Sequence, residues 1–208
     1  MKIYDRYGIW LLPTLIFLLS FLFVDVCSAQ YRQLVFEQVT TREGLSKSTV
    51  SHIIQDRSGF LWFATLDGLN KYDGYTFKVY RKNNKDKTSI SSNDVIFLFE
   101  DSKGYLWIVN GSRTGLDRFD PESETFENFR HDPADPESLS SNRIFNVSQD
   151  SKGNIWICTE KALNLFIPPE DNGNKKVRFE KYRNSGSSSP ITWVFENSNG
   201  QLLLLSEY

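Results

Sequence analysis

Four times in this 208-residue chain an apolar run ends at an acidic or amide residue, passes through a Gly-containing turn, and restarts as an apolar strand. These turns lie at 56–59, 101–104, 150–153 and 197–200. The tryptophans that follow the first three, Trp62, Trp107 and Trp156, are 45 and 49 residues apart, and Leu203 takes the same place 47 residues later. A period of this length with several short strands per unit is typical of a radial array of small β-sheets. The sequence therefore predicts a β-propeller.

Two further markers recur in register with the tryptophans. A Gly-Leu pair, weakened to Ala-Leu in the third repeat, places Leu69, Leu116 and Leu163 at intervals of 47 residues. An aromatic strand follows at 77–80, 126–129 and 179–182. Each repeat is therefore interpreted as four short antiparallel strands. We predict blades at 45–81, 90–130 and 139–183, and a half blade at 190–205.

The two ends of the repeat array are incomplete. The segment 34–40 aligns with the outer strands of the later repeats, so we expect an outermost strand whose own inner strands are missing. The fourth repeat stops after its second strand. A propeller ring usually has about four to eight blades. We therefore expect residues 30–208 to form an open arc of about three to four blades, as an N-terminal fragment or truncated gene product.

The first 29 residues differ from the repeats. Residues 9–24 are almost entirely apolar, follow two basic residues, and precede small residues that end at Ala29. Sixteen helical residues span about 24 Å, which is shorter than the hydrocarbon core of about 30 Å. This pattern predicts a signal helix that is cleaved after export, so that 1–29 is a signal peptide. A lipoprotein signal is the less favoured alternative, because Val26 rather than a small residue precedes Cys27.

Composition argues against a nucleic-acid partner. The chain has 24 Lys and Arg against 26 Asp and Glu, a net charge of −2, and its basic residues are scattered. A surface that tracks phosphates needs clustered basic residues. Once Cys27 leaves with the signal, Cys158 is the only thiol. We interpret it as a small buried apolar group rather than a reactive one.

The first repeat resembles a known family. The string 43–46, the strand 50–56, the run 59–65 and the segment 67–77 are similar to the two-component regulator propeller repeat. The similarity covers about 31–208, although Ala162 replaces the marker Gly and Leu203 replaces Trp. These departures concern the packing of the third and fourth blades.

The resemblance implies a sensor. Family members form the periplasmic sensor half of hybrid two-component histidine kinases of gut Bacteroidetes, anchored in the inner membrane. They detect breakdown products of polysaccharides and control genes for carbohydrate use. The implied partners are an oligosaccharide, the remaining propeller blades, a following β-sandwich domain and a second copy in a homodimer. The resemblance implies neither an enzyme activity nor a cofactor for these 208 residues.

The repeated residues are also weighed as sites. The three tryptophans could stack on sugars, but one copy per blade favours packing between blades. Asp56, Asp101 and Asp150 could be metal ligands or paired acids, but their fixed place at a hairpin start favours turn capping. Paired acids for glycoside hydrolysis need carboxyls within about 5–10 Å. We therefore predict no catalytic and no metal-binding residue.

Loops that break the repeat are the weaker ligand candidates. The polar loops 82–93 and 131–142 could contact a charged oligosaccharide, although solvated connectors are the simpler interpretation. The enlarged join at 110–113 is a similar candidate. His52 and His131 are too isolated to predict a metal site or a base. The residues that contact ligand stay unassigned.

Two alternative classes remain. An exported propeller hydrolase or lyase would fit the signal and the fold, but the turn spacing differs from that of sialidase and quinone-dependent dehydrogenase repeats. A plain protein-interaction propeller is not excluded by residues alone, because a fold does not dictate function.

Overall fold

The computed structural model describes residues 36, 38–111, 113–169, 176–183 and 189–206. The chain divides into two units, 1–38 and 39–208, and the fold below is that of the second unit. The expected signal peptide 1–29 lies outside the described residues. Among the residues that are described, no helix has the length and hydrophobicity needed to cross a bilayer.

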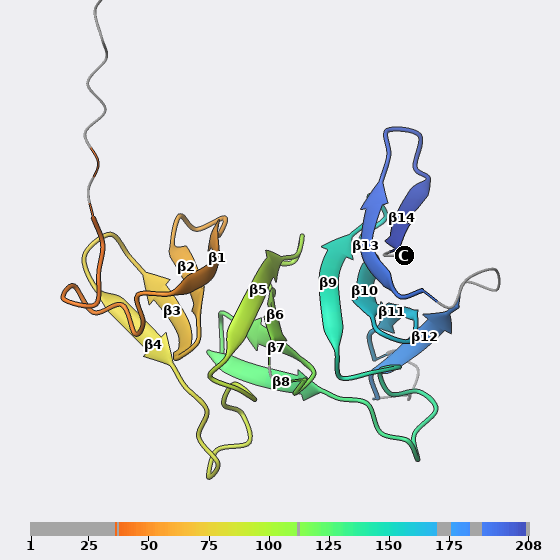
Figure 1. Cartoon of the computed structure of the whole chain (residues 1–208), viewed down its shortest axis with the longest axis horizontal. Helices are drawn as coiled ribbons and strands as arrows, with labels where there is room; N and C mark the ends of the chain where they lie inside the picture. Colours follow the sequence, from red (N-terminus) through yellow and green to blue (C-terminus); the bar gives the residue numbers. More distant parts are fainter. Residues whose placement is uncertain (1–35, 37, 112, 170–175, 184–188, 207–208) are drawn as a thin grey trace, which may run out of the picture. The chain divides into compact units, whose positions relative to one another are not determined.

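The described chain is all-β, as predicted. Three sheets are four-stranded antiparallel meanders and a fourth contains two strands (Figure 1). The first sheet comprises β1 (Val50–Gln55), β2 (Leu61–Thr65), β3 (Gly68–Tyr72) and β4 (Phe77–Tyr80). The second comprises β5 (Val95–Glu100), β6 (Leu106–Asn110), β7 (Leu116–Asp120) and β8 (Thr125–Phe129). The third comprises β9 (Ile144–Gln149), β10 (Ile155–Thr159), β11 (Leu163–Ile167) and β12 (Arg178–Tyr182), and the fourth comprises β13 (Ile191–Glu196) and β14 (Leu202–Ser206).

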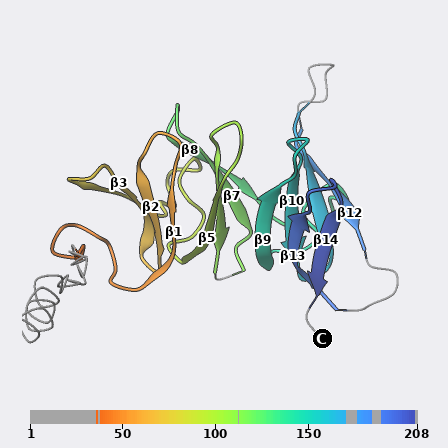
Figure 2. The same cartoon turned by 90° about the horizontal axis from the view of Figure 1, so that it is seen from above.

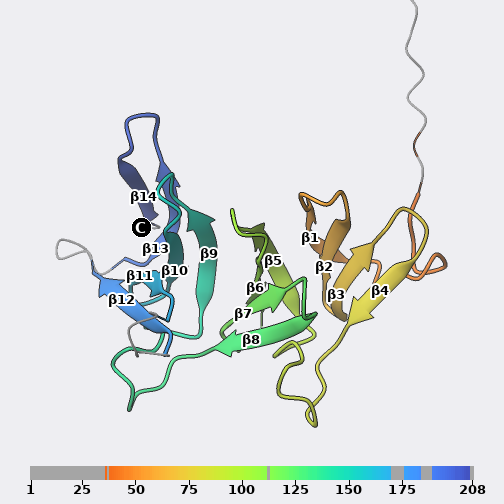
Figure 3. The same cartoon turned by 180° about the vertical axis from the view of Figure 1, so that it is seen from behind.

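The sheets follow one another as propeller blades do. The first strands β1, β5, β9 and β13 contact each other in this order, and Figure 2 shows the sheets side by side. The last strands β4, β8 and β12 form the opposite edge of each sheet (Figure 3). The described strands form an open array of blades, in agreement with the predicted incomplete arc.

The core lies between successive sheets. One cluster joins the first and second sheets around Trp62, Leu98 and Phe119. A second joins the second and third sheets around Trp107, and a third, around Trp156, joins the third sheet to β13. Every residue of β6 and β10 is buried, because a strand in the middle of a covered blade has apolar neighbours on both faces.

A glycine marks the start of the third strand for a steric reason. Gly68 and Gly115 have φ of 110° and 99°. A Cβ there would lie 2.5 Å from Tyr80 O and 2.3 Å from Phe129 O, respectively. The third blade tolerates Ala162 because this residue does not have the positive φ of Gly68 and Gly115. Its N donates to Thr159 Oγ1 at 3.2 Å, whereas Gly68 N donates to Asn93 O at 2.7 Å. Ala162 is buried, so this departure from the repeat does not open the blade.

One expectation needs correction. The described residues of the expected outer strand 34–40, Phe36 and 38–40, are not in a strand. A strand requires a hydrogen-bonded neighbour, and none of the described sheets includes these residues. At the other end, the replacement of Trp by Leu203 does affect the packing, as the sequence indicated, since Leu203 is 52% exposed where the tryptophans are buried. No third strand covers β14 among the described residues, so its side chains lack the facing layer that buries β6 and β10.

Candidate functional site

The aspartates of the repeat cap their turns, as predicted. Asp56 Oδ1 accepts hydrogen bonds from Ser58 N at 2.9 Å and Phe60 N at 3.0 Å. Asp101 and Asp150 repeat both bonds at 2.9–3.1 Å. This accepting geometry is that of an Asx turn, in which the side chain replaces backbone acceptors. The Oδ1 atoms of these aspartates are therefore occupied by the backbone N–H groups of the hairpins.

The same aspartates also hold the tryptophans. Trp62 Nε1 donates to Asp56 Oδ2 at 2.7 Å, and Trp107 and Trp156 donate to their aspartates at 2.8 and 2.9 Å. The three indoles are only 2%, 0% and 9% exposed. The predicted packing role is thus confirmed. The bond between Asp and Trp was missed, although the constant spacing of six residues was its signal.

The fourth repeat, in which Asn197 replaces the aspartate, shows which hydrogen bonds require a carboxylate. Asn197 Oδ1 accepts the same two backbone bonds, from Asn199 N and Gln201 N at 3.0 Å. Leu203 replaces Trp and offers no N–H, and the second end of the Asn197 side chain instead donates to Gln201 Oε1 at 3.1 Å. An amide therefore suffices for the turn, and the carboxylate is needed where an indole must be bound.

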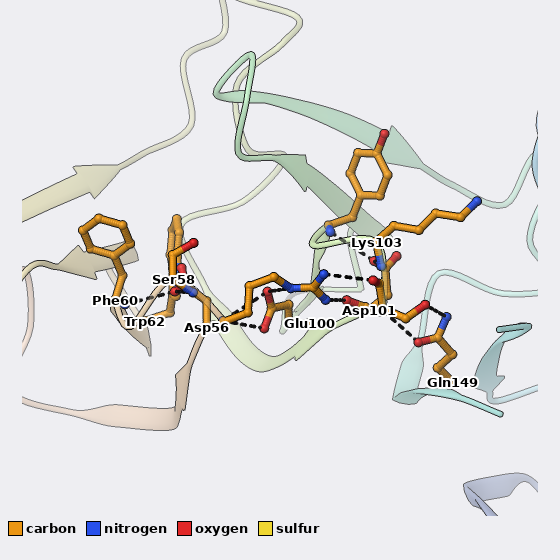
Figure 4. A network of polar contacts seen from close by, with 11 residues as sticks. Asp56, Ser58, Phe60, Trp62, Glu100, Asp101, Lys103 and Gln149 are labelled. Carbon is orange, nitrogen blue, oxygen red and sulfur yellow. Dashed lines mark hydrogen bonds and ion pairs between the residues drawn. The ribbon is translucent and has the colours of Figure 1, made fainter. Parts of the chain in front are cut away.

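A second contact joins each turn to the next blade (Figure 4). Ser102 N donates to Gln149 Oε1 at 2.8 Å, and Gln149 Nε2 donates to Ser102 Oγ at 2.9 Å. Arg57 N donates to Glu100 Oε2 at 3.0 Å, and the Arg57 side chain forms an ion pair with Glu100 at 2.8 Å. Ser151 and Glu196 repeat the contact between the third sheet and β13. We call these contacts the turn latch.

Gln149→Leu is expected to lower the free energy of unfolding by about 1–2 kcal/mol, because two hydrogen bonds across the blades are lost at about 0.5–1.5 kcal/mol each. Gln55→Leu is the matched control. Gln55 has the same place in β1 and the same local bond to Gly59 O, at 3.1 Å, that Gln149 makes to Gly153 O. Urea unfolding followed by circular dichroism gives both values, and equal losses would show that the latch adds nothing.

A third repeated network ties the loop before each blade to its central strands. In the first blade Ser46 N donates to Asn70 Oδ1 at 2.9 Å, and Ser46 Oγ lies 2.9 Å from Thr65 Oγ1. The third blade reproduces both distances within 0.2 Å with Ser140, Asn164 and Thr159. These polar side chains hold backbone that would otherwise be unsatisfied in the core.

The second blade uses a carboxyl in this network. Asp117 replaces Asn and is fully buried. Its Oδ2 accepts from Ser91 N at 2.9 Å and Asn110 Nδ2 at 2.9 Å, and its Oδ1 accepts from Asn128 Nδ2 at 2.7 Å. Burial raises the pKa of the Asp117 carboxyl, and the hydrogen bonds oppose this shift without cancelling it. Sequence reasoning missed this residue.

The two long loops are packed connectors. In each, a serine holds the loop together: Ser89 Oγ donates to Asp86 O at 2.7 Å, and Ser138 Oγ donates to Asp135 O at 2.8 Å. Each also covers the free edge of the next outer strand. Phe126 N in β8 donates to Thr88 O, and Phe179 N in β12 donates to Glu137 O, both at 2.8 Å. The loops 82–93 and 131–142 therefore protect strand edges, which is a structural role.

The positively charged side chain of Arg118 lines a cleft between the second and third blades. The cleft has a volume of about 350 Å³ and is lined in part by Lys103, Tyr105 and Arg118. The Arg118 guanidinium lies 4.6 Å from the centre of the Tyr105 ring and pairs with Glu127 at 2.6 Å. The same guanidinium lies 5.2 Å from the centre of the Phe166 ring in the third blade, so the Arg118 side chain joins the two blades.

The other sequence candidates are not brought together. His52 packs against Phe97, with ring centres 4.6 Å apart, and burial lowers its pKa. His131 Nδ1 lies 2.7 Å from Leu139 O in the second long loop. Gly111, in the enlarged join 110–113, packs directly against Asp94. In the described part of the chain, no group of His, Cys, Asp and Glu could hold a metal ion.

Cys158 is predicted to be unreactive in the folded protein. It is fully buried on β10, and burial raises the pKa of its thiol to about 12. The thiolate is the reactive form, so a thiol reagent at pH 8 should label Cys158 more than 100-fold more slowly in buffer than in denaturant. A Cys27→Ser background removes the other thiol. Equal labelling rates would contradict the buried position.

The fold and its repeated turns define a propeller built from a family repeat. Residues 44–67 and 138–161 match the family model described as two component regulator propeller. The match includes the first and third of the turns whose Asp binds Trp. These two segments of the chain therefore match the two component regulator propeller model, as the resemblance predicted.

The proteins similar to this chain include a histidine kinase and the extracellular domain of a two-component system. One is Histidine kinase P4 of Formosa agariphila, 51% identical over 76 residues, which are 36% of this chain and 6% of that protein. The other is the extracellular domain of a hybrid two-component system of B. thetaiotaomicron, 28% identical with a TM-score of 0.68. That alignment covers 81% of this chain and 23% of the domain. The chain thus spans less than a quarter of either relative.

Proposed function

We propose that this chain is the ligand-sensing propeller portion of an exported two-component sensor. The observation that supports the proposal is the similarity to the extracellular domain of a hybrid two-component system over 81% of the chain, at 28% identity and a TM-score of 0.68. The similarity to a histidine kinase supports the same role. In this proposal the chain lies in the periplasm after cleavage of residues 1–29, and its parent protein is anchored in the inner membrane.

The proposed ligand is an oligosaccharide released from a polysaccharide, and the proposed output is control of genes for carbohydrate use. Further propeller blades, a following β-sandwich and a second copy of the sensor are the proposed partners. The hydrogen bonds that the repeated aspartates already accept favour a binding protein over an enzyme. Each of Asp56, Asp101 and Asp150 already accepts two backbone N–H bonds and one indole N–H bond, so none of them is poised for acid–base chemistry.

The test is binding and turnover measured on the same samples. The purified protein is titrated with oligosaccharides from partial digests of several plant and algal polysaccharides by calorimetry, and each mixture is then chromatographed for products. We expect at least one oligosaccharide to bind with no product formed. Turnover would favour the hydrolase or lyase alternative, and a panel without any binding would favour a protein-interaction propeller.

A genetic arm tests the output. Deletion of the gene should abolish induction of carbohydrate-utilisation genes by the oligosaccharide that binds, and leave induction by an unrelated sugar unchanged. Unaltered induction by the bound oligosaccharide would contradict the sensor role, whatever the affinity.

A further inference from the structure

The third residue of each first strand lies beside a β-bulge. Every first strand has an irregular register with its neighbour next to this residue. Such a bulge re-aims the side chain beside it. The four residues are His52, Phe97, Asn146 and Trp193. Phe97 contacts His52 at 4.6 Å and Trp193 at 6.1 Å between ring centres, so side chains from three sheets converge on one inner surface.

A pocket of about 320 Å³ opens on this inner surface. Its wall is mainly apolar and includes the aromatic residues Phe97, Phe99, Trp193 and Phe195. Trp193 and Phe195 are 48% and 59% exposed. Exposed aromatic faces around a concavity are suited to stacking against a ligand ring.

The wall also contains one amide side chain, Asn146, for which the packing of the fold gives no structural role. Asn146 is 1% exposed, and its Oδ1 has no hydrogen-bond partner among the described residues. An unpaired buried amide is destabilising. The other blades place His, Phe and Trp at this position, so the strand itself does not require an amide. Rotation about the terminal torsion of Asn exchanges its oxygen and nitrogen, and either can then face the pocket.

Three of the charged and polar side chains that line the pocket are already engaged. Glu196 bonds Ser151 in the turn latch, and Asp150 binds the Trp156 indole. Gln149 bonds Ser102. The pocket therefore offers an aromatic surface, the Asn146 amide and the Ser148 hydroxyl, while its carboxylates are held in structural bonds.

We infer that this pocket binds a neutral sugar unit, with the apolar face of the ring against Trp193 and a hydroxyl hydrogen-bonded to the Asn146 amide. A hydroxyl both donates and accepts, so it matches an amide in either orientation. The carboxylates at the rim disfavour a uronate. The inference rests on the proposed function and deepens it, because it specifies an uncharged sugar unit and names the residues that contact it.

Asn146→Leu separates this role from a structural one. Without ligand, the variant should unfold at a temperature about 2–4 °C higher than the wild type, because an unpaired buried amide is replaced by an apolar group of similar size. With neutral oligosaccharides its affinity should fall at least tenfold. A lower unfolding temperature would overturn the inference, since it would show that the fold uses the amide.

Trp193→Ala tests the stacking surface, and Leu204→Ala is its matched control. Both residues are about half exposed on the last sheet, and Leu204 does not line the pocket. The Trp193 variant should lose at least tenfold in affinity for neutral oligosaccharides, while the control keeps wild-type affinity. Tighter binding of uronate-containing oligosaccharides than of neutral ones would overturn the inference.

The outcomes distinguish the inference from the proposed function. If the wild type binds an oligosaccharide and the Asn146 and Trp193 variants bind it equally well, the pocket assignment fails and the sensor role stands. If the wild type binds none of the oligosaccharides, both fail.

Discussion

Trp107→Ala is expected to lower the free energy of unfolding by about 3–5 kcal/mol, the cost of a large cavity in a packed core. Trp107 is fully buried between the second and third blades. It stacks on Phe129 with ring centres 5.9 Å apart and meets Phe166 edge-on at 5.0 Å. The change also removes the indole donor of Asp101 Oδ2 at a buried position. The loss therefore combines a cavity with an unpaired carboxylate oxygen.

Urea unfolding followed by circular dichroism measures this loss, and Trp193→Ala is its control. Trp193 is 48% exposed, so its removal should cost about 1 kcal/mol or less. A Trp107 variant that loses no more than the Trp193 variant would show that the repeat tryptophans do not hold the blades together. A change in the slope of the unfolding free energy against urea concentration would indicate a change in the surface exposed on unfolding or a loss of two-state behaviour.

The strands and turns could be predicted because their signals are local. An Asp followed by Gly within one turn fixes a hairpin whatever surrounds it, and the structure has Gly59 N bonded to Asp56 O at 2.9 Å. The period of the tryptophans then fixes the order of the blades, since each repeat must bury the same faces. Both steps need only neighbours in sequence and a count of residues.

Contacts between repeats could not be predicted in this way. The turn latch joins Ser102 to Gln149, 47 residues later, and nothing in the strand ending at Gln149 indicates its partner. The loop 82–93 offered a polar composition that suits a connector or a ligand site equally well. Only the bond from Phe126 N to Thr88 O shows that the loop covers a strand edge.

The pocket that we propose as a sugar site was missed for a related reason. A comparison of repeats emphasises the residues that all units share, whereas a ligand site depends on residues that differ between units. Asn146 interrupts an otherwise apolar stretch of β9 where the other blades have a ring, and this difference was visible in the sequence. Its meaning depended on the pocket wall supplied by Trp193 from another sheet.

Asp117→Asn is expected to destabilise the protein at neutral pH by about 1–3 kcal/mol, and adding Asn110→Thr should recover at least half of this loss. Four hydrogen bonds converge on the Asp117 carboxylate from Ser91, Asn110 and Asn128. An amide has one accepting oxygen, so its NH₂ group would face another donor, and an unpaired buried group costs about 1–3 kcal/mol. The double variant restores the Thr and Asn pair that the first and third blades use at these positions.

The double variant also isolates the pH dependence of this carboxyl. The unfolded carboxyl ionises near its ordinary pKa of 3.8, whereas the folded one keeps its proton to a higher pH. In that interval the unfolded state binds fewer protons, so the contribution of Asp117 to stability falls as pH rises and levels off above the folded pKa. The stability of the wild type minus that of the double variant, measured by urea unfolding from pH 4 to 8, should therefore decrease with pH. Surface carboxylates with lowered pKa, such as Asp67 and Asp73, act in the opposite direction but cancel in this difference. A difference that grows with pH would mean that the four hydrogen bonds outweigh burial and that Asp117 is held as a stable buried anion.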